Sequence, residues 1–174
     1  MKNPFELFGL TPAYALDLEH LERAYRDIQS KVHPDRFAHA GDAERRASMQ
    51  MTTQVNEAYR ILKSPVLRAK YLLELNGVDV AFETNTAMPK DFLAQQMELR
   101  ERLEEARDAA TLDALREELL AQRSDLEREI ARHIDCERHF SGASDLVRKL
   151  RFLERFGEEI DSAHEGLEMR APEA

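Results

Sequence analysis

The chain has 174 residues, of which 43% are hydrophobic and 34% are charged, and its net charge at pH 7 is −9. No apolar run approaches the roughly 20 residues that a membrane-spanning helix needs, and the single cysteine, Cys136, excludes a disulfide within the chain. Six Gly, six Pro and no Trp suit amphipathic helices better than sheets, which need turn residues at short intervals. The N-terminus resembles neither a signal peptide nor a transit peptide, so we expect a protein of the bacterial cytoplasm with no membrane partner.

Charge is distributed unevenly along the chain. Residues 1–75 carry 11 basic and 10 acidic side chains, whereas residues 76–174 carry 14 and 24. The resulting net charges of +1 and −10 predict two halves with different partners. An acidic half repels the phosphates of nucleic acid, so we expect no nucleic-acid partner.

The first half is predicted to contain a helical hairpin. A short apolar turn follows Asn3-Pro4, and Asp17 is suited to cap the next helix. Apolar residues then recur every three or four positions as far as Pro34, and again after Gly41-Asp42, which opens another helix. The two stripes are Leu18, Leu21, Tyr25, Ile28 and Val32, and Met51, Val55, Ala58 and Leu62. The two stripes are expected to face each other in an antiparallel pair of helices, with the loop 33–41 at the tip of this hairpin.

Further helix breakers divide the rest of the chain. Ser64-Pro65 predicts a helix start and Asn76-Gly77 predicts the end of that helix, whereas residues 78–88 lack a helical period and are predicted to be a linker. Three helices are then expected at 89–109, 111–139 and 144–166, separated by Thr111 and by Ser141-Gly142-Ala143-Ser144. We therefore expect an all-α, L-shaped chain, with an N-terminal unit of residues 1–77 and a three-helix bundle over 89–174.

The tripeptide His33-Pro34-Asp35 lies where the first long helix must end. Pro34 fixes its own φ and donates no backbone hydrogen bond, so the turn is rigid. We expect this turn to hold His33 and Asp35 outward, as a donor and an acceptor suited to an Arg-bearing partner. Basic residues lie nearby in the sequence: Arg23, Arg26, Lys31 and Arg36. The plainer alternative is that Pro34 only terminates the helix and the charges form a solvated face.

Residues 1–75 resemble the J-domain of the DnaJ superfamily. The resemblance rests on His33-Pro34-Asp35 and on Asn56-Glu57-Ala58-Tyr59 in the second helix of the hairpin. It implies binding to the ATPase domain of a DnaK-type chaperone and acceleration of ATP hydrolysis there. Two residues depart from the pattern: Val32 stands where an aromatic residue is common, and Arg36 stands where lysine is commoner.

The helix expected after Pro89 has two different faces. At about 100° per residue, one face gathers the residues that should pack into the bundle, namely Phe92, Leu99, Leu103 and Ala106. A second stripe begins apolar with Leu93 and Met97 and becomes acidic along the helix. These two residues either form a shallow patch for a partner or pack against the first half or a neighbouring helix. Periodicity alone favours packing, because buried stripes outnumber docking sites.

Past the linker the chain is similar to the HscB family of co-chaperones. The similarity is carried by Phe92–Glu101, Leu146–Leu153 and Arg68–Leu73, and with the J-domain it covers nearly the whole chain. It implies a role in iron–sulfur cluster assembly, with the chaperone HscA and the scaffold protein IscU as partners. The scaffold-binding positions that it implies are Leu93, Ala94, Met97, Glu98, Glu101, Glu105 and Phe152. The family often has a larger apolar residue next to Leu93, so Ala94 should reduce the contact area.

No catalytic, metal or cofactor site is expected. The chain lacks a Gly-rich phosphate loop and a recognisable catalytic grouping, so we do not expect an enzyme. His133, Cys136 and His139 recur at spacings of three, and Glu129 or Glu137 could join them as zinc ligands. Structural zinc sites usually draw ligands from separate elements, and no CxxC pair is present, so the sequence predicts no metal.

The sequence therefore predicts an adaptor that holds a scaffold and a chaperone together. Holding both raises the effective concentration of the scaffold at the peptide site of the chaperone. The nearest alternative is a general J-domain co-chaperone for unfolded clients, although this chain lacks the Gly/Phe-rich and cysteine-rich regions of such proteins. A helix-turn-helix regulator would use the basic hairpin on DNA, which the acidic half argues against. A passive helical assembly protein would not affect any ATPase.

Overall fold

The computed structural model describes residues 3–37, 39–82 and 88–169. These residues form helices joined by turns and irregular segments, with no strand among them, so the all-α prediction is confirmed. The first half contains α1 (Pro4–Leu7), α2 (Leu18–Val32), the 3₁₀ turn η1 (Pro34–Phe37), α3 (Asp42–Lys63) and α4 (Pro65–Leu75). The second half contains α5 (Lys90–Glu105), α6 (Ala109–Ala131), the π-helical turn η2 (Arg132–Cys136) and α7 (Phe140–Glu168).

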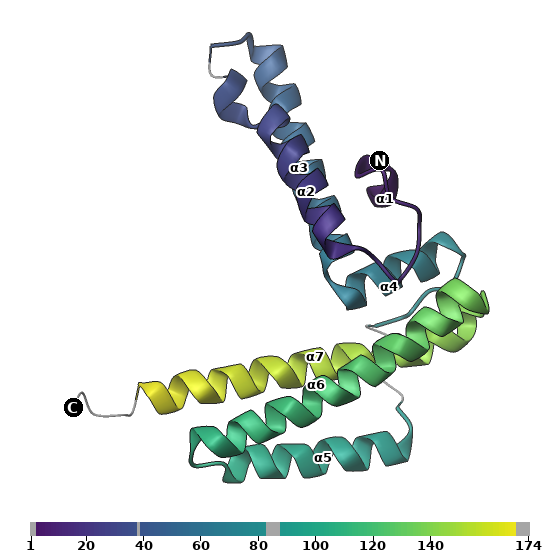
Figure 1. Ribbon diagram of the computed structural model, residues 1–174, viewed down its shortest axis with the longest axis vertical. Coiled ribbons are helices and arrows are strands. Elements are labelled where there is room, and N and C mark those ends of the chain that lie inside the picture. Colours follow the sequence, from purple (N-terminus) through teal and green to yellow (C-terminus); the bar gives the residue numbers. More distant parts are fainter. Residues whose placement is uncertain (1–2, 38, 83–87, 170–174) are drawn as a thin grey trace.

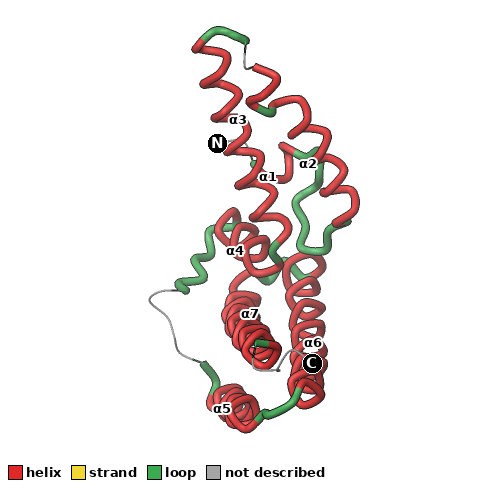
Figure 2. The backbone as a smooth tube through the Cα atoms, turned by 90° about the vertical axis from the view of Figure 1, so that its left-hand side faces the viewer, coloured by secondary structure: helices red, strands yellow, loops and turns green. Residues whose placement is uncertain are grey.

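Two elongated arms extend from the region around α4 (Figure 1). One arm is the α2–α3 hairpin, with α1 beside it, and the other contains α5, α6 and α7. Figure 2 shows α4 between the hairpin and α7, and α5 at the far side of the second arm. None of the helices in the described ranges combines the length and the apolar character needed to cross a membrane.

The predicted helix ends of the first half are confirmed by their caps. Asp17 Oδ1 accepts a hydrogen bond from the backbone N–H of His20 at 2.9 Å, and Ser64 Oγ accepts one from that of Leu67 at 3.2 Å. After α4, Gly77 has a φ of +78°, a left-handed conformation that glycine adopts without steric cost. The two side-chain caps satisfy backbone donors that a helix start leaves without a partner.

The predicted hairpin is held together by aromatic and polar contacts between α2 and α3. The rings of Tyr25 and Tyr59 stack with centroids 4.0 Å apart and an interplanar angle of 16°. The Tyr25 hydroxyl also donates to Asn56 Oδ1 at 3.1 Å, while Ala58 is buried. The segment Asn56–Tyr59 therefore serves to close the hairpin.

The predicted stripe on α3 is wrong at Met51, which is exposed. Ser48 is buried in the α2–α3 seam instead, and its hydroxyl donates to the backbone carbonyl of Val32 at 2.6 Å. The hydroxyl of Ser48 thus supplies a hydrogen-bond donor to a backbone carbonyl at the end of α2. A methionine side chain has no such donor. Leu18, at the start of the α2 stripe, is also exposed, because it lies in the first turn of its helix.

In the second half, the helix boundaries differ from the prediction. α5 ends at Glu105, and Asp108 caps α6 by accepting a hydrogen bond from the backbone N–H of Thr111 at 2.8 Å, so the break precedes Thr111. The segment Ser141–Ser144 is not a break, because α7 already begins at Phe140. Ala143 and Ser144 are buried, and Ala143 packs into the core that joins α7 to the first half, so the second part of this run serves helix packing.

The hydrophobic core does not divide at the predicted linker. One cluster contains residues of the four helices α1, α2, α3 and α4 together with residues at the junction of α6 and α7. The junction contributes Ile130, Ile134, Ala143, Val147 and Leu150. Val80, within the predicted linker, is fully buried in this cluster. A second cluster joins α5, α6 and α7 around Phe92, Leu115 and Phe156, as expected of the bundle. Asn85 and Thr86, on which the linker prediction also drew, lie outside the described residues.

Candidate functional site

The end of α2 presents His33 and Asp35 to solvent. His33 leaves the helical conformation with a φ of −58° and a ψ of 131°, and Pro34 begins the 3₁₀ turn η1. The side chain of His33 is 50% exposed and that of Asp35 is 90% exposed. The backbone N–H of Asp35 donates to His33 Nδ1 at 3.3 Å, which braces the tripeptide from within. Both side chains are open to a partner, as the sequence predicts.

The turn that carries the tripeptide is also fixed to its surroundings. The backbone N–H of Arg36 donates to the carbonyl of His33 at 3.1 Å, and Arg36 Nη1 donates to the carbonyl of Ser30 at 3.1 Å. Thr52 Oγ1 on α3 donates to the carbonyl of Val32 at 3.1 Å. These bonds satisfy carbonyls at the end of α2, so Arg36 acts as a helix cap in addition to supplying charge.

The basic residues of α2 are exposed, but two of them are paired. Arg23 lies 3.6 Å from Glu19 and Arg26 lies 2.9 Å from Glu22, each one turn away on the same helix. Lys31, near the tip, makes no ion pair with any residue that the structure describes. Exposed pairs of this kind are weak, so both arginines can exchange their partners at little cost.

The second predicted surface lies on α5, where apolar side chains face solvent. Leu93 is 39% exposed and Met97 is 64% exposed, whereas Phe92 and Leu99 of the same helix are buried in the bundle. The alternative that Met97 packs against the first half or a neighbouring helix is therefore wrong. The remaining predicted members of this surface on α5 are exposed: Ala94, Glu98, Glu101 and Glu105.

Phe152 of α7 joins Leu93 in the wall of a shallow cavity. The cavity has a volume of about 190 Å³ and is lined by Phe82, Met88, Leu93, Arg148, Arg151, Phe152 and Arg155. The ring of Phe152 packs edge-on against the ring of Phe92, with their centroids 5.7 Å apart. The guanidinium of Arg100 lies 4.9 Å from the centroid of the Phe152 ring. We call the exposed apolar residues Leu93, Ala94 and Met97, together with this cavity, the α5–α7 patch.

Sequence reasoning missed the basic wall of the α5–α7 patch. Arg148, Arg151 and Arg155 recur at spacings of three and four on α7, a signal visible in the sequence. Arg151 lies 4.4 Å from the ring centroid of Phe82, and Arg148 Nη1 donates to the carbonyl of Val80 at 3.3 Å. The patch thus combines an apolar floor and a basic wall with the acidic residues of α5 nearby.

His133, Cys136 and His139, for which the sequence predicts no metal, are only partly brought together. His133 and His139 lie close to each other at the turn between α6 and α7, but their third neighbour is Glu137. Cys136 is exposed and is not in this group. On a regular helix Cys136 would lie about a sixth of a turn away from His133, and His139 about a third of a turn away. The π-helical turn changes which of these residues meet.

Two family models match the chain, one before and one after residues 83–87. A DnaJ domain matches residues 3–71, and an HSCB C-terminal oligomerisation domain matches residues 88–161. Among curated relatives, a co-chaperone protein HscB homolog from Aromatoleum aromaticum is 48% identical over 167 residues, covering 94% of each chain. A homolog of the same name from Burkholderia thailandensis is 49% identical over 167 residues, covering 94% of this chain and 95% of its own.

Solved structures of similar proteins share the whole fold. The chaperone HscB from Vibrio cholerae is 34% identical, with a TM-score of 0.83 over 95% of this chain and 99% of its own. The human co-chaperone protein HscB is 27% identical, with a TM-score of 0.88 over 94% of this chain and 83% of its own. The residues that the two family models match contain the tripeptide tip and, except for Phe82, the α5–α7 patch.

Proposed function

This chain belongs to the HscB family of J-domain co-chaperones, and from that we propose that it delivers an iron–sulfur scaffold protein of the IscU type to a DnaK-type chaperone of the HscA type. In this proposal the tip at His33-Pro34-Asp35 binds the chaperone and stimulates its ATPase. The α5–α7 patch binds the scaffold at the same time. The outcome is the maturation of iron–sulfur proteins, with the chain acting as an adaptor and the chaperone hydrolysing the ATP.

The observation that carries the proposal is the separation of two exposed surfaces on two arms. The turn that carries the tip lies at the far end of the α2–α3 hairpin, whereas α5 and α7, which carry the patch, lie in the other arm (Figure 1). A partner bound to one arm therefore leaves the other arm accessible. Holding both partners on one chain raises their effective concentration without any contact between the two sites.

The chemistry of the tip suits a charged chaperone surface. Asp35 is almost fully exposed and offers a carboxylate that an arginine can bind with two parallel hydrogen bonds. Because Pro34 and the bonds of Arg36 already fix the turn, little conformational entropy is lost on binding. Exposed basic residues along α2 would speed the encounter with an acidic surface.

The chemistry of the patch suits a partner with an apolar centre and a mixed charged rim. Burial of Leu93 and Met97 stabilises a complex by about 25 cal/mol per Å² of apolar area removed from water. The flexible side chain of Met97 can adapt to the contour of the partner. Carboxylates of α5 and arginines of α7 lie around this apolar centre, and such opposite charges fix the orientation of a partner.

A binding experiment with an IscU-type scaffold tests the second surface. We expect the double change Leu93→Ala and Met97→Ala to weaken binding at least tenfold in titration calorimetry, because the apolar centre is lost. Ala94→Leu, which enlarges that centre, should tighten binding several-fold. Leu120→Ala is the matched control, because Leu120 is an exposed leucine on α6 outside the patch. Full affinity in the double variant would show that the scaffold binds elsewhere.

A steady-state ATPase assay with the chaperone tests the tip. Asp35→Asn should abolish stimulation while leaving scaffold binding intact, because only the charge of one exposed side chain changes. Asp27→Asn provides the control, since Asp27 is an exposed aspartate on α2 outside the tripeptide. Undiminished stimulation by the Asp35 variant would refute the role of the tip.

A further inference from the structure

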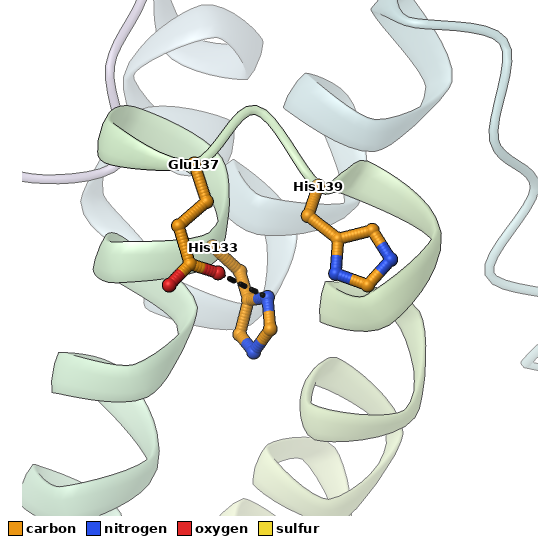
Figure 3. A group of neighbouring side chains, drawn as sticks. All are labelled: His133, Glu137 and His139. Atoms are coloured by element: carbon orange, nitrogen blue, oxygen red, sulfur yellow. Dashed lines mark ion pairs between the residues drawn. The ribbon is translucent and has the colours of Figure 1, made fainter.

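Three metal-ligating side chains meet at the turn between α6 and α7 (Figure 3). One potential ligand atom from each of His133, Glu137 and His139 lies within 4.8 Å of those of the other two. Two imidazoles and a carboxylate form a ligand set that suits zinc and neighbouring divalent transition metals. We propose that these three residues bind a divalent transition-metal ion, for which Zn²⁺ is the best match, with solvent completing its coordination.

Two backbone features bring His139 back to His133. η2 is a π-helical turn, a rare geometry that is often found at functional sites. Arg138 has a φ of +55°, in the left-handed region that non-glycine residues seldom adopt. The chain reverses there, so that the backbone N–H of His139 donates to the carbonyl of His133 at 2.8 Å. The imidazole centroids consequently lie only 5.3 Å apart.

Gly142, in the first turn of α7, provides the space for the imidazole of His139. A Cβ atom at this position would lie 2.6 Å from both Nδ1 and Cε1 of His139, and 3.3 Å from Cε1 of His133. Any larger residue would push the exposed ring of His139 away. The convergence of the three ligands therefore depends on a residue that is not itself a ligand.

The polar atoms of the trio are arranged for a cation. His133 Nδ1 is buried and has no hydrogen-bond partner among the described residues, although Glu137 Oε2 lies 3.2 Å away at an angle unsuited to a hydrogen bond. An ion between these two atoms would coordinate both. Arg132 Nε lies 3.3 Å from Glu137 Oε1, the other oxygen, and so orients the carboxylate with Oε2 toward His133.

Binding requires only a small contraction of the trio. Zinc lies about 2.0–2.2 Å from nitrogen and oxygen ligands, so tetrahedral ligand atoms are roughly 3.4 Å apart. Glu137 and His139 are exposed and can rotate toward the half-buried His133. The ion would join η2 to α7, at the junction that packs into the core of the first half. Metal binding is therefore expected to raise the thermal midpoint of unfolding.

Titration calorimetry of the untagged, chelator-treated full chain with zinc chloride tests the proposal. We expect one ion per chain with a dissociation constant of about 10 µM or tighter, well below the range of isolated surface histidines. His139→Ala and Glu137→Gln should each weaken binding at least tenfold, and both positions are exposed, so folding is preserved. Gly142→Ala should weaken binding similarly although it keeps all three ligands.

Two matched variants provide the controls. Gly166→Ala changes another glycine of α7, where a Cβ meets nothing within 4 Å, and Cys136→Ser changes the neighbouring thiol outside the trio. Both should bind zinc like the unaltered chain and show the same rise in thermal midpoint. The proposal is overturned if the unaltered chain binds zinc only above about 100 µM, or if His139→Ala and Glu137→Gln leave the affinity unchanged. Loss of binding in Cys136→Ser would also overturn this ligand set.

Discussion

The carboxylate of Asp135 accepts a hydrogen bond from the backbone N–H of Tyr14 at 2.7 Å, although the two residues lie 121 positions apart. Its second oxygen accepts one from the backbone N–H of Ala15 at 2.8 Å. The guanidinium of Arg68 lies 5.0 Å from the centroid of the Tyr14 ring, and burial raises the pKa of Tyr14 and lowers that of Arg68. Asp135 thus connects the turn between α6 and α7 to the J-domain, and the contact fixes one arm against the other.

Removing this connection is expected to loosen the joint between the arms. Asp135→Ala leaves two backbone N–H groups without their charged acceptor, which should lower the free energy of unfolding by about 2–3 kcal/mol. Urea unfolding followed by circular dichroism measures the change. Asp125→Ala is the control, because Asp125 is an exposed aspartate on α6 that pairs only locally with Arg128. Equal stability of the two variants would show that the joint is held by apolar packing alone.

Neighbouring residues of α5 should separate stability from binding. Leu99 is 2% exposed, so Leu99→Ala should cost about 2–5 kcal/mol of stability through cavity formation. Met97→Ala should change stability by less than about 0.5 kcal/mol, because Met97 is mostly in solvent. Chemical denaturation of the two variants measures both effects. A large loss of stability in Met97→Ala would mean that this side chain belongs to the core rather than to a docking surface.

Gln96 is a polar residue in the apolar interface of the bundle. It is 2% exposed, and neither its amide nitrogen nor its amide oxygen has a hydrogen-bond partner among the described residues. Gln96→Leu should therefore stabilise the chain by about 1–2 kcal/mol, because an unsatisfied buried amide is replaced by apolar surface. The exposed neighbour gives the control variant Gln95→Leu, which should be nearly neutral. A destabilised Gln96→Leu variant would reveal that the amide is satisfied in solution.

Glu154 of α7 should make stability depend on pH. Burial raises the pKa of this carboxyl above its usual value, although the nearby guanidinium of Arg123 partly opposes the rise. The folded state then binds the proton more tightly than the unfolded chain, so this stabilisation is complete at acidic pH and is lost as pH rises through the folded-state pKa. Glu154→Gln should therefore raise the thermal midpoint by about 2 °C at pH 7, and much less near pH 4.

The exposed Glu165 on the same helix gives the control variant, Glu165→Gln. Its thermal midpoint should follow that of the unaltered chain at both pH values, as measured by calorimetry. An unchanged midpoint of Glu154→Gln at pH 7 would mean that the carboxylate is as well solvated in the folded state as in the unfolded one.

The first half could be predicted from the sequence because its signals are local. Asp17, Pro34, Ser64 and Gly77 each start or end a helix through their own backbone or side-chain chemistry, and each does so in the structure. The exposure of His33 and Asp35 follows from the same rigid turn. Periodicity places Met51 in the buried stripe because it does not reveal that the end of α2 needs a hydroxyl donor from α3.

The second half was predicted less well because its features depend on distant contacts. The run Ser141–Ser144 has loop-like composition, yet its Ala143 lies where α7 packs into the core of the first half. Phe82 and the arginines of α7 meet Leu93 only in the folded chain, so the cavity has no local signature. Glu137 joins His133 and His139 whereas Cys136 does not, because the π-helical turn departs from the spacing that a regular helical wheel represents.

In the proposed adaptor, one chain must carry both surfaces. Chaperone ATPase activity in the presence of the scaffold, measured with a mixture of two variants, tests this requirement. One variant, Asp35→Asn, keeps only the patch, and the other, Leu93→Ala with Met97→Ala, keeps only the tip. An adaptor predicts that the equimolar mixture fails to restore the stimulation given by the unaltered chain. Full restoration by the mixture would show that the two surfaces act independently and that the chain is not an adaptor.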